Sequence, residues 1–292
     1  MMLQNKNAVI YAAGGGIGGA VARAFARGGA PEAERYAASL PMNLTHAASN
    51  FDSDGEATRH PVRRSRGFWL GMALLCCAIA VVGFIPVYYG PVLHGTATFP
   101  LRLHLHAAAA SFWLLLLIAQ TGLIWSGRPQ VHMRVGIAAL VIAGALVPLT
   151  LWAIAGMVTR SDPPGALERA VFFPQIASLM LFVAWVIAGF LNRQHPERHK
   201  RFMLMATIAL LGTPIARIDL WGINEQPLLM LALWLGPALI LVLYDLWVRR
   251  RVHWVTGLCL SLLVAMQVAT VVLMENEAWG VLVARIADAL RS

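Results

Sequence analysis

The chain has 292 residues, of which 59% are hydrophobic and only 13% are charged. Soluble domains carry roughly 25% charged residues, so this composition excludes most soluble enzyme classes and predicts a membrane protein. The formal net charge is +9. The basic residues stand in short clusters between apolar runs, which is typical of topology signals rather than of nucleic-acid binding.

Residues 1–30 differ in character from the rest of the chain. Their sequence predicts a strand, a glycine-rich turn and a helix, and it resembles the opening βα unit of the short-chain dehydrogenases. Gly16 and Gly18 match the last two glycines of that family's turn, whereas Ala12 stands at the position of the first. The chain has no Tyr-x-x-x-Lys pair for the family's catalysis. We therefore expect a truncated, non-functional stub, no NAD(P) cofactor and no working short-chain dehydrogenase.

Residues 31–66 are rich in Ala, Ser, Asp and Arg and show no hydrophobic period, which predicts a disordered lead-in. This segment ends in a basic run formed by Arg59, Arg63, Arg64 and Arg66. We expect the run to stop the chain at the membrane surface.

Seven apolar runs follow one another from residue 67 to residue 274, and each is long enough to cross a bilayer. Roughly 20 apolar helical residues span the hydrocarbon core. The sequence therefore predicts an all-α polytopic bundle of seven transmembrane helices, at residues 67–89, 101–125, 133–158, 170–191, 202–221, 228–248 and 254–274. Residues 275–292 are predicted to form a short amphipathic tail.

The basic residues support a count of seven helices. With seven helices, the four basic clusters all fall on one side of the membrane, in the lead-in and in the second, fourth and sixth connections. A count of six or eight would scatter them. Because cytoplasmic loops carry an excess of Lys and Arg, we predict a bacterial inner-membrane protein with its N-terminus inside and its C-terminus outside.

Ionisable residues near hydrocarbon are costly and mark candidate sites. One group lies near the predicted outer side and consists of His94, His104, His106, Arg217 and Asp219. This group predicts an outward-facing site for a quinone, a haem propionate or an anionic substrate, with Arg217 and Asp219 as substrate-binding residues. Two residues apart on a helix, His104 and His106 point to roughly opposite sides. The alternative is a structural ion pair beside histidines at the interface.

A second group, His132, His199 and His253, lies at the predicted cytoplasmic starts of three helices. Imidazole is a common ligand of metals and haem, and a six-coordinate b-type haem needs two facing histidines. The predicted metal ligands are these three residues, and the predicted cofactor ligands are His132, His199, His104 and His106. The alternative is that the inner histidines contact lipid phosphate among the arginines of cytoplasmic turns.

Motifs along residues 94–220 resemble a family of uncharacterised bacterial multi-spanning inner-membrane proteins. They are His104 with Trp113 and Gln120, then His132-Met133-Arg134-Val135-Gly136, then His199 followed by Arg217. Met133 departs from the family pattern, in which Arg follows His directly. The family implies helix-start histidines and no particular activity. The histidines at helix ends are also similar to those of cytochrome b561-type bundles and of membrane proteins that assist oxidase assembly.

Three functions stay open at this point. The first is a redox-associated membrane component, with haem b and a respiratory-chain or quinone partner. The second is a transporter or small-molecule binding protein that uses Arg217 and Asp219. The third is an assembly or structural factor without a ligand. Whether the protein is an enzyme is open, no catalytic residue is predicted, and nucleic acid is not an expected partner.

Overall fold

The computed structural model describes residues 66–218, 227–274 and 276–292. These residues form helices and contain no β-strand, in agreement with the all-α prediction. The dehydrogenase-like stub, the lead-in up to Ser65 and the candidate residue Asp219 lie outside the described residues.

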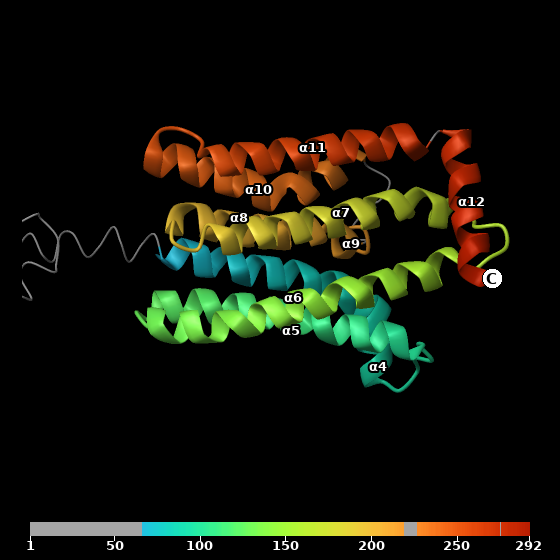
Figure 1. Ribbon diagram of the computed structural model, residues 1–292, viewed down its shortest axis with the longest axis horizontal. Helices are drawn as coiled ribbons and strands as arrows, with labels where there is room; N and C mark the ends of the chain where they lie inside the picture. Colours follow the sequence, from blue (N-terminus) through green and yellow to red (C-terminus); the bar gives the residue numbers. More distant parts are fainter. Residues whose placement is uncertain (1–65, 219–226, 275) are drawn as a thin grey trace, which may run out of the picture. The chain divides into compact units, whose positions relative to one another are not determined.

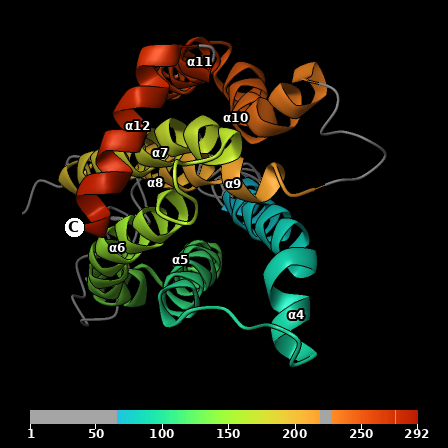
Figure 2. The same ribbon diagram turned by 90° about the vertical axis from the view of Figure 1, so that its right-hand side faces the viewer.

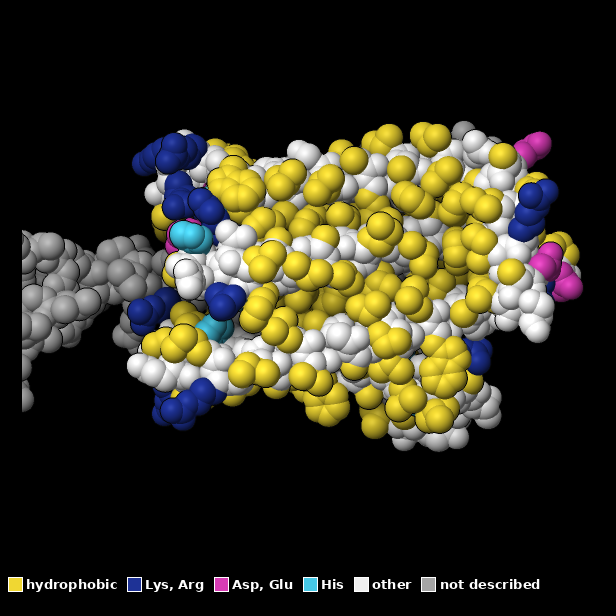
Figure 3. Space-filling model, in the orientation of Figure 1, with side chains coloured by type: hydrophobic (Ala, Val, Ile, Leu, Met, Phe, Trp, Pro, Cys, Tyr) yellow, Lys and Arg dark blue, Asp and Glu magenta, His cyan; other side chains and the backbone are white. Residues whose placement is uncertain are grey.

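Six described helices are long and apolar enough to cross a membrane. They run side by side in the Arg63–Ser292 unit (Figure 1), and hydrophobic side chains cover the face between its two ends (Figure 3). The six are Arg66–Leu93, α5 (Leu101–Trp125), α6 (Pro129–Val158), α7 (Ala166–Leu191), α10 (Pro227–Arg249, with Leu229–Arg249 as the span) and α11 (Trp254–Met274). The first span includes the π-helical turn η1 (Ile85–Tyr89) and the short helix α4 (Gly90–Leu93).

The fifth predicted helix, at residues 202–221, is not one continuous helix. The chain forms α8 over Pro196–Leu210 and then the separate four-residue helix α9 over Gly212–Ile215. Pro214 has no N–H for the carbonyl of Leu210, and Gly212 is a poor helix former. The described residues therefore contain six helices of membrane length, where the sequence predicted seven.

Helix α8 is nevertheless the most enclosed helix of the described bundle. It packs against α7, α10 and α11, and its buried residues are Arg201, Phe202, Leu204, Met205, Ala206, Thr207, Ile208 and Ala209. The indole Nε1 of Trp113 on α5 donates a hydrogen bond of 3.0 Å to the hydroxyl of Thr207. Because neighbouring helices shield α8 from lipid, it can be short and can carry charge at membrane depth.

Charged side chains gather at the two ends of this unit (Figure 3). One end, which we call the basic end, carries the Lys and Arg residues of the connections before α6, before α8 and before α11. They are Arg128, Arg134, Arg193, Arg198, Lys200, Arg249, Arg250 and Arg251. The opposite end, which we call the far end, has acidic and basic residues together and bears α12.

Helix α12 (Glu277–Arg291) lies across the far end of the bundle (Figure 2). The side chain of Asn276 caps it by accepting a hydrogen bond from the N–H of Trp279. Val283 and Ala287 on its inner face are fully buried against α6 and α7. Its outer face exposes apolar side chains, so α12 has the character of a helix that lies in a membrane interface.

Candidate functional site

A polar group, here called the far-end cluster, joins Arg102 and His106 of α5, Thr150 of α6, and Arg217 just after α9. Arg102 and His106 are four residues apart and therefore share one face of α5. Both face α6, because His106 Nδ1 lies 3.3 Å from the hydroxyl of Thr150 and the guanidinium of Arg102 fills the space beside Gly156. A Cβ at Gly156 would collide with Nε of Arg102, so a larger residue there would displace the guanidinium.

The hydrogen bonds of Thr150 fix the tautomer of neutral His106. The Thr150 hydroxyl donates its only hydrogen to the carbonyl of Leu146 at 2.6 Å, so it must accept from Nδ1–H of His106. A neutral His106 therefore keeps a lone pair at Nε2, which can accept a hydrogen bond from a hydroxyl group.

Arg217 adds a second guanidinium to the cluster. It donates to the carbonyl of Thr213 at 2.7 Å, lies 5.2 Å from the centre of the Phe84 ring, and is within electrostatic range of His106. The Nε of Arg102 is buried and has no hydrogen-bond partner among the described residues. No described carboxylate forms an ion pair with either arginine. The cluster thus offers positive charge and unused donors.

The other predicted residues of the outer group lie elsewhere. His104 faces the first span, where its Nδ1 lies 2.9 Å from the hydroxyl of Tyr88. It is therefore on the side of α5 away from His106, as the two-residue spacing requires. His94 is exposed just after α4. The structure brings together His106 and Arg217 and adds Arg102 and Thr150, which sequence reasoning did not single out.

At the basic end, His132 of α6 and His199 of α8 are in ring contact, with centroids 6.1 Å apart and planes at 85°. The amide of buried Gln120, in the orientation that satisfies both of its ends, donates to His132 Nδ1 at 2.5 Å and accepts from the N–H of Gly136 at 3.0 Å. His199 Nδ1 donates to the carbonyl of Gly189 at 2.8 Å. Neutral His132 thus carries its proton at Nε2, whereas His199 has its lone pair there.

This arrangement does not fit a haem held between the two histidines. Two axial imidazoles lie on opposite faces of a porphyrin, and each presents an Nε2 lone pair to the iron. Here the rings touch each other edge to face, and the Nε2 of His132 carries a proton. The third predicted ligand, His253, is engaged elsewhere: it stacks on Trp254 and accepts from the N–H of Val255. In the described parts of the chain, no three His, Cys, Asp or Glu residues are grouped for a metal.

Sequence reasoning missed the most deeply buried charges of the described structure, the ion pair between Arg201 of α8 and Asp245 of α10. Both side chains have 0% exposure. Asp245 also accepts from the hydroxyl of Thr256 at 2.7 Å and from the N–H of His253 at 3.1 Å, which ties α10 to the start of α11. The sequence does indicate a buried charge here, because Asp245 is the only charged residue in the apolar run from 227 to 248.

This network shifts the pKa values of two titratable groups at the surface of the basic end, Glu197 and His253. Burial raises the pKa of Glu197, but hydrogen bonds from Lys200 and Arg201 outweigh it and leave the pKa below its ordinary value of 4.5. Burial lowers the pKa of His253, and the charges of Arg201 and Arg249 lower it further. At neutral pH, the two shifts favour the ionised form of Glu197 and the neutral form of His253.

Family models, curated proteins and solved structures were compared with the chain. No match was found. The resemblances suggested by the His motifs and by residues 1–30 therefore stay predictions. The far-end cluster and the histidine pair are the features from which a function can be argued.

Proposed function

We propose that this integral membrane protein binds a small lipophilic molecule that carries a carboxylate or a quinone-type carbonyl, and that the far-end cluster is its binding site. The observation that carries the proposal is the buried Nε of Arg102, which has no hydrogen-bond partner among the described residues. A buried donor without a partner costs roughly 1–3 kcal/mol, and a ligand oxygen would supply the missing acceptor.

The chemistry of the cluster supports this ligand class. Guanidinium groups bind carboxylate and carbonyl oxygens through directed N–H donors, and they do so most strongly where water is scarce. The free Nε2 of His106 would accept a hydrogen bond from a hydroxyl of the same ligand, as a reduced quinone presents. The excess positive charge of the cluster would favour anionic forms.

We further propose that the protein resides in the plasma membrane, the inner membrane of a bacterium, with the basic end in the cytoplasm. The clustering of Lys and Arg at one end supports this orientation. The far-end cluster would then take its ligand from the outer leaflet or from outside the cell.

The test is thermal unfolding of the detergent-purified chain with decanoate or ubiquinone-1, and with decane as an apolar control. We expect either the carboxylate or the quinone probe to raise the melting temperature and decane to have no effect. Arg102→Gln and Arg217→Gln should abolish the rise, whereas Arg160→Gln, which removes an exposed far-end charge, should keep it. The probe that acts identifies the ligand class.

Two outcomes would contradict the proposal. In one, neither probe stabilises a wild-type protein that unfolds cooperatively. In the other, the arginine variants are stabilised as strongly as Arg160→Gln. The melting temperature of each variant without a probe shows whether the variant itself is folded.

A redox role is the second candidate, and a quinone ligand would support it. Its test is the visible spectrum of the purified protein, air-oxidised and then reduced with dithionite. Because the rings of His132 and His199 are in contact with each other, we expect no haem band that requires both residues as ligands. A band that shifts on reduction and is lost in His132→Ala would instead establish the haem b that the sequence predicts.

A further inference from the structure

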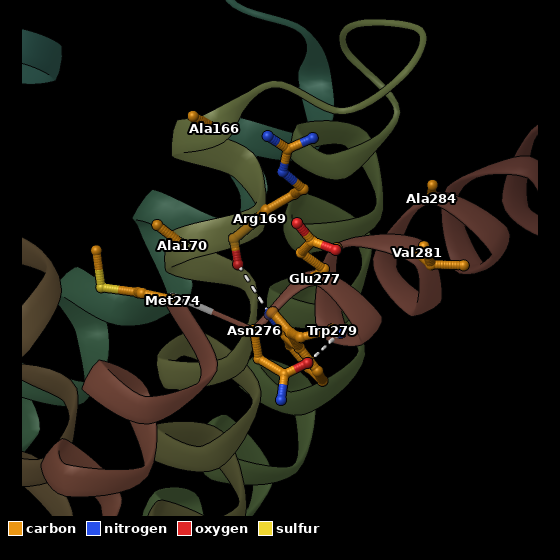
Figure 4. A pocket seen from close by; sticks show the side chains of 10 residues that line it. Ala166, Arg169, Ala170, Met274, Asn276, Glu277, Trp279, Val281 and Ala284 are labelled. Carbon is orange, nitrogen blue, oxygen red and sulfur yellow. Dashed lines mark hydrogen bonds between the residues drawn. The ribbon is translucent and has the colours of Figure 1, made fainter.

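A cavity of about 460 Å³ lies where α7, α11 and α12 meet (Figure 4). It shares no residue with the far-end cluster. Much of its lining is small or apolar, formed by Ala166, Ala170, Met274, Gly280, Val281 and Ala284. Two charged side chains, Arg169 of α7 and Glu277 of α12, also line it.

These two charges border the cavity without neutralising each other. Arg169 and Glu277 form no ion pair with each other or with another described residue. Arg169 donates one hydrogen bond, to the carbonyl of Pro164 at 3.2 Å, so other N–H groups of its guanidinium stay available. The cavity therefore presents a cation on α7 and an anion on α12 among small and apolar side chains.

The position of the cavity points to lipid. Met274 and Val281 are 59% and 55% exposed on its rim, so apolar surface continues outward from the cavity. Trp279 lines it as well and donates from Nε1 to the backbone carbonyl of Arg169 at 3.1 Å, which fixes α12 against α7. An amphipathic helix, a tryptophan and an arginine at the end of a membrane helix are the features of the lipid headgroup region.

We propose that this cavity binds a zwitterionic phospholipid with a primary ammonium group, of the phosphatidylethanolamine type. The phosphate accepts hydrogen bonds from the guanidinium of Arg169, and the ammonium donates to the carboxylate of Glu277. The start of an acyl chain lies over Ala170 and Met274. The site is separate from the ligand site proposed above, so either can fail without the other.

The two charges also set the preference among lipids. Phosphatidylcholine has the same phosphate, but its quaternary ammonium has no N–H to donate to Glu277. Phosphatidylglycerol has hydroxyl groups that can donate to Glu277 but no cation, so its net negative charge is not offset beside that carboxylate. We expect the order ethanolamine, then choline, then glycerol. The ethanolamine lipid should bind roughly fivefold tighter than the choline lipid, since a half-exposed hydrogen bond to a charged group contributes about 1 kcal/mol.

Native mass spectrometry of the full chain, titrated with the three lipids at matched acyl chains, tests the proposal. Glu277→Gln should remove the preference for ethanolamine over choline and leave choline binding unchanged. Arg169→Gln should weaken both lipids. Glu168→Gln and Arg285→Gln each remove one charge outside the cavity, one negative and one positive. They are the matched controls and should behave as wild type.

Equal binding of the ethanolamine and choline lipids to the wild-type protein would overturn the proposal. So would a Glu277→Gln variant that keeps the wild-type preference. Because Trp279 bonds to the backbone of Arg169, the Arg169→Gln variant should keep α12 in place. Arg169→Lys, which keeps the positive charge, should recover part of the phosphate binding and shows that a loss in Arg169→Gln is not a loss of fold.

Discussion

At the residue scale, the ion pair between Arg201 and Asp245 joins the two most deeply buried charges of the described structure. Both charges are fully buried, and Arg201 has a second ionic partner in the half-exposed Glu197 at 2.7 Å. Asp245→Asn leaves the buried guanidinium with Glu197 alone and should destabilise the protein by up to about 3–5 kcal/mol. Thermal unfolding in detergent measures the loss. Asp288→Asn, which alters an exposed ion pair with Arg291, should change stability by less than about 1 kcal/mol.

The same pair can be tested by removing both charges together. A double variant, Arg201→Met with Asp245→Leu, leaves no buried charge and should recover most of the stability lost in Asp245→Asn. If the single variant unfolds at the wild-type temperature, the ion pair does not hold α8 and α10 together.

His253 gives the basic end a dependence on pH. Its Nδ1 accepts from the N–H of Val255 in the first turn of α11, and its pKa lies below the ordinary 6.5. A depressed pKa means that the unfolded chain binds the proton more readily, so stability falls as pH drops below about 6.5. The melting temperature should therefore fall between pH 7 and pH 5, and less steeply in His253→Asn. Parallel curves for the two proteins would show that another group is responsible.

Single residues also show what the sequence could and could not predict. The two-residue spacing of His104 and His106 was enough to place them on different sides of α5. The contact between His132 and His199 needs the starts of α6 and α8 to approach each other, which no local pattern encodes. Arg102 looked like an ordinary residue at a helix start, because only its contact with Gly156 and its unpartnered Nε distinguish it.

At the scale of elements, the first span meets α9 at a glycine. A Cβ on Gly83 would come within 2.7 Å of the carbonyl carbon of Pro214, which is backbone and cannot move aside. Gly83→Ala should therefore push the two elements apart and destabilise the protein by about 1–3 kcal/mol. Gly71→Ala in the same span meets nothing within 4 Å and should be neutral or slightly stabilising. Equal melting temperatures for the two variants would contradict this packing.

Hydropathy predicted the lipid-facing helices well and did not predict that the enclosed segment divides into α8 and α9. Residues 101–125 and 254–274 were predicted with the bounds that α5 and α11 have. Those helices expose apolar faces to lipid, so their composition and length follow from the bilayer. Helix α8 is surrounded by protein, and the bilayer does not dictate its length or composition. The ring of Trp234 from α10 lies against Gly212, and a hydropathy pattern does not encode such a contact.

At the scale of the whole described unit, six membrane-length helices and the α8–α9 segment carry the chain between two ends of different charge. Figure 1 shows α8 starting at the basic end beside the last turn of α7, with α9 further toward the far end. We propose that α8 and α9 together complete a seventh crossing. The basic end and α12 would then face opposite sides of the membrane, as the distribution of Lys and Arg predicts.

Cysteine labelling in intact cells tests this architecture most directly. In a background without Cys76, Cys77 and Cys259, one cysteine is placed at Arg193 before α8, at Arg250 before α11, or at Ser292 beyond α12. A membrane-impermeant maleimide should label the Ser292→Cys protein from outside, and should label the Arg193→Cys and Arg250→Cys proteins only after the cells are permeabilised. Labelling of Arg193→Cys and Arg250→Cys from opposite sides would contradict the seven crossings, and labelling of Ser292→Cys only after permeabilisation would contradict the outward-facing ligand site.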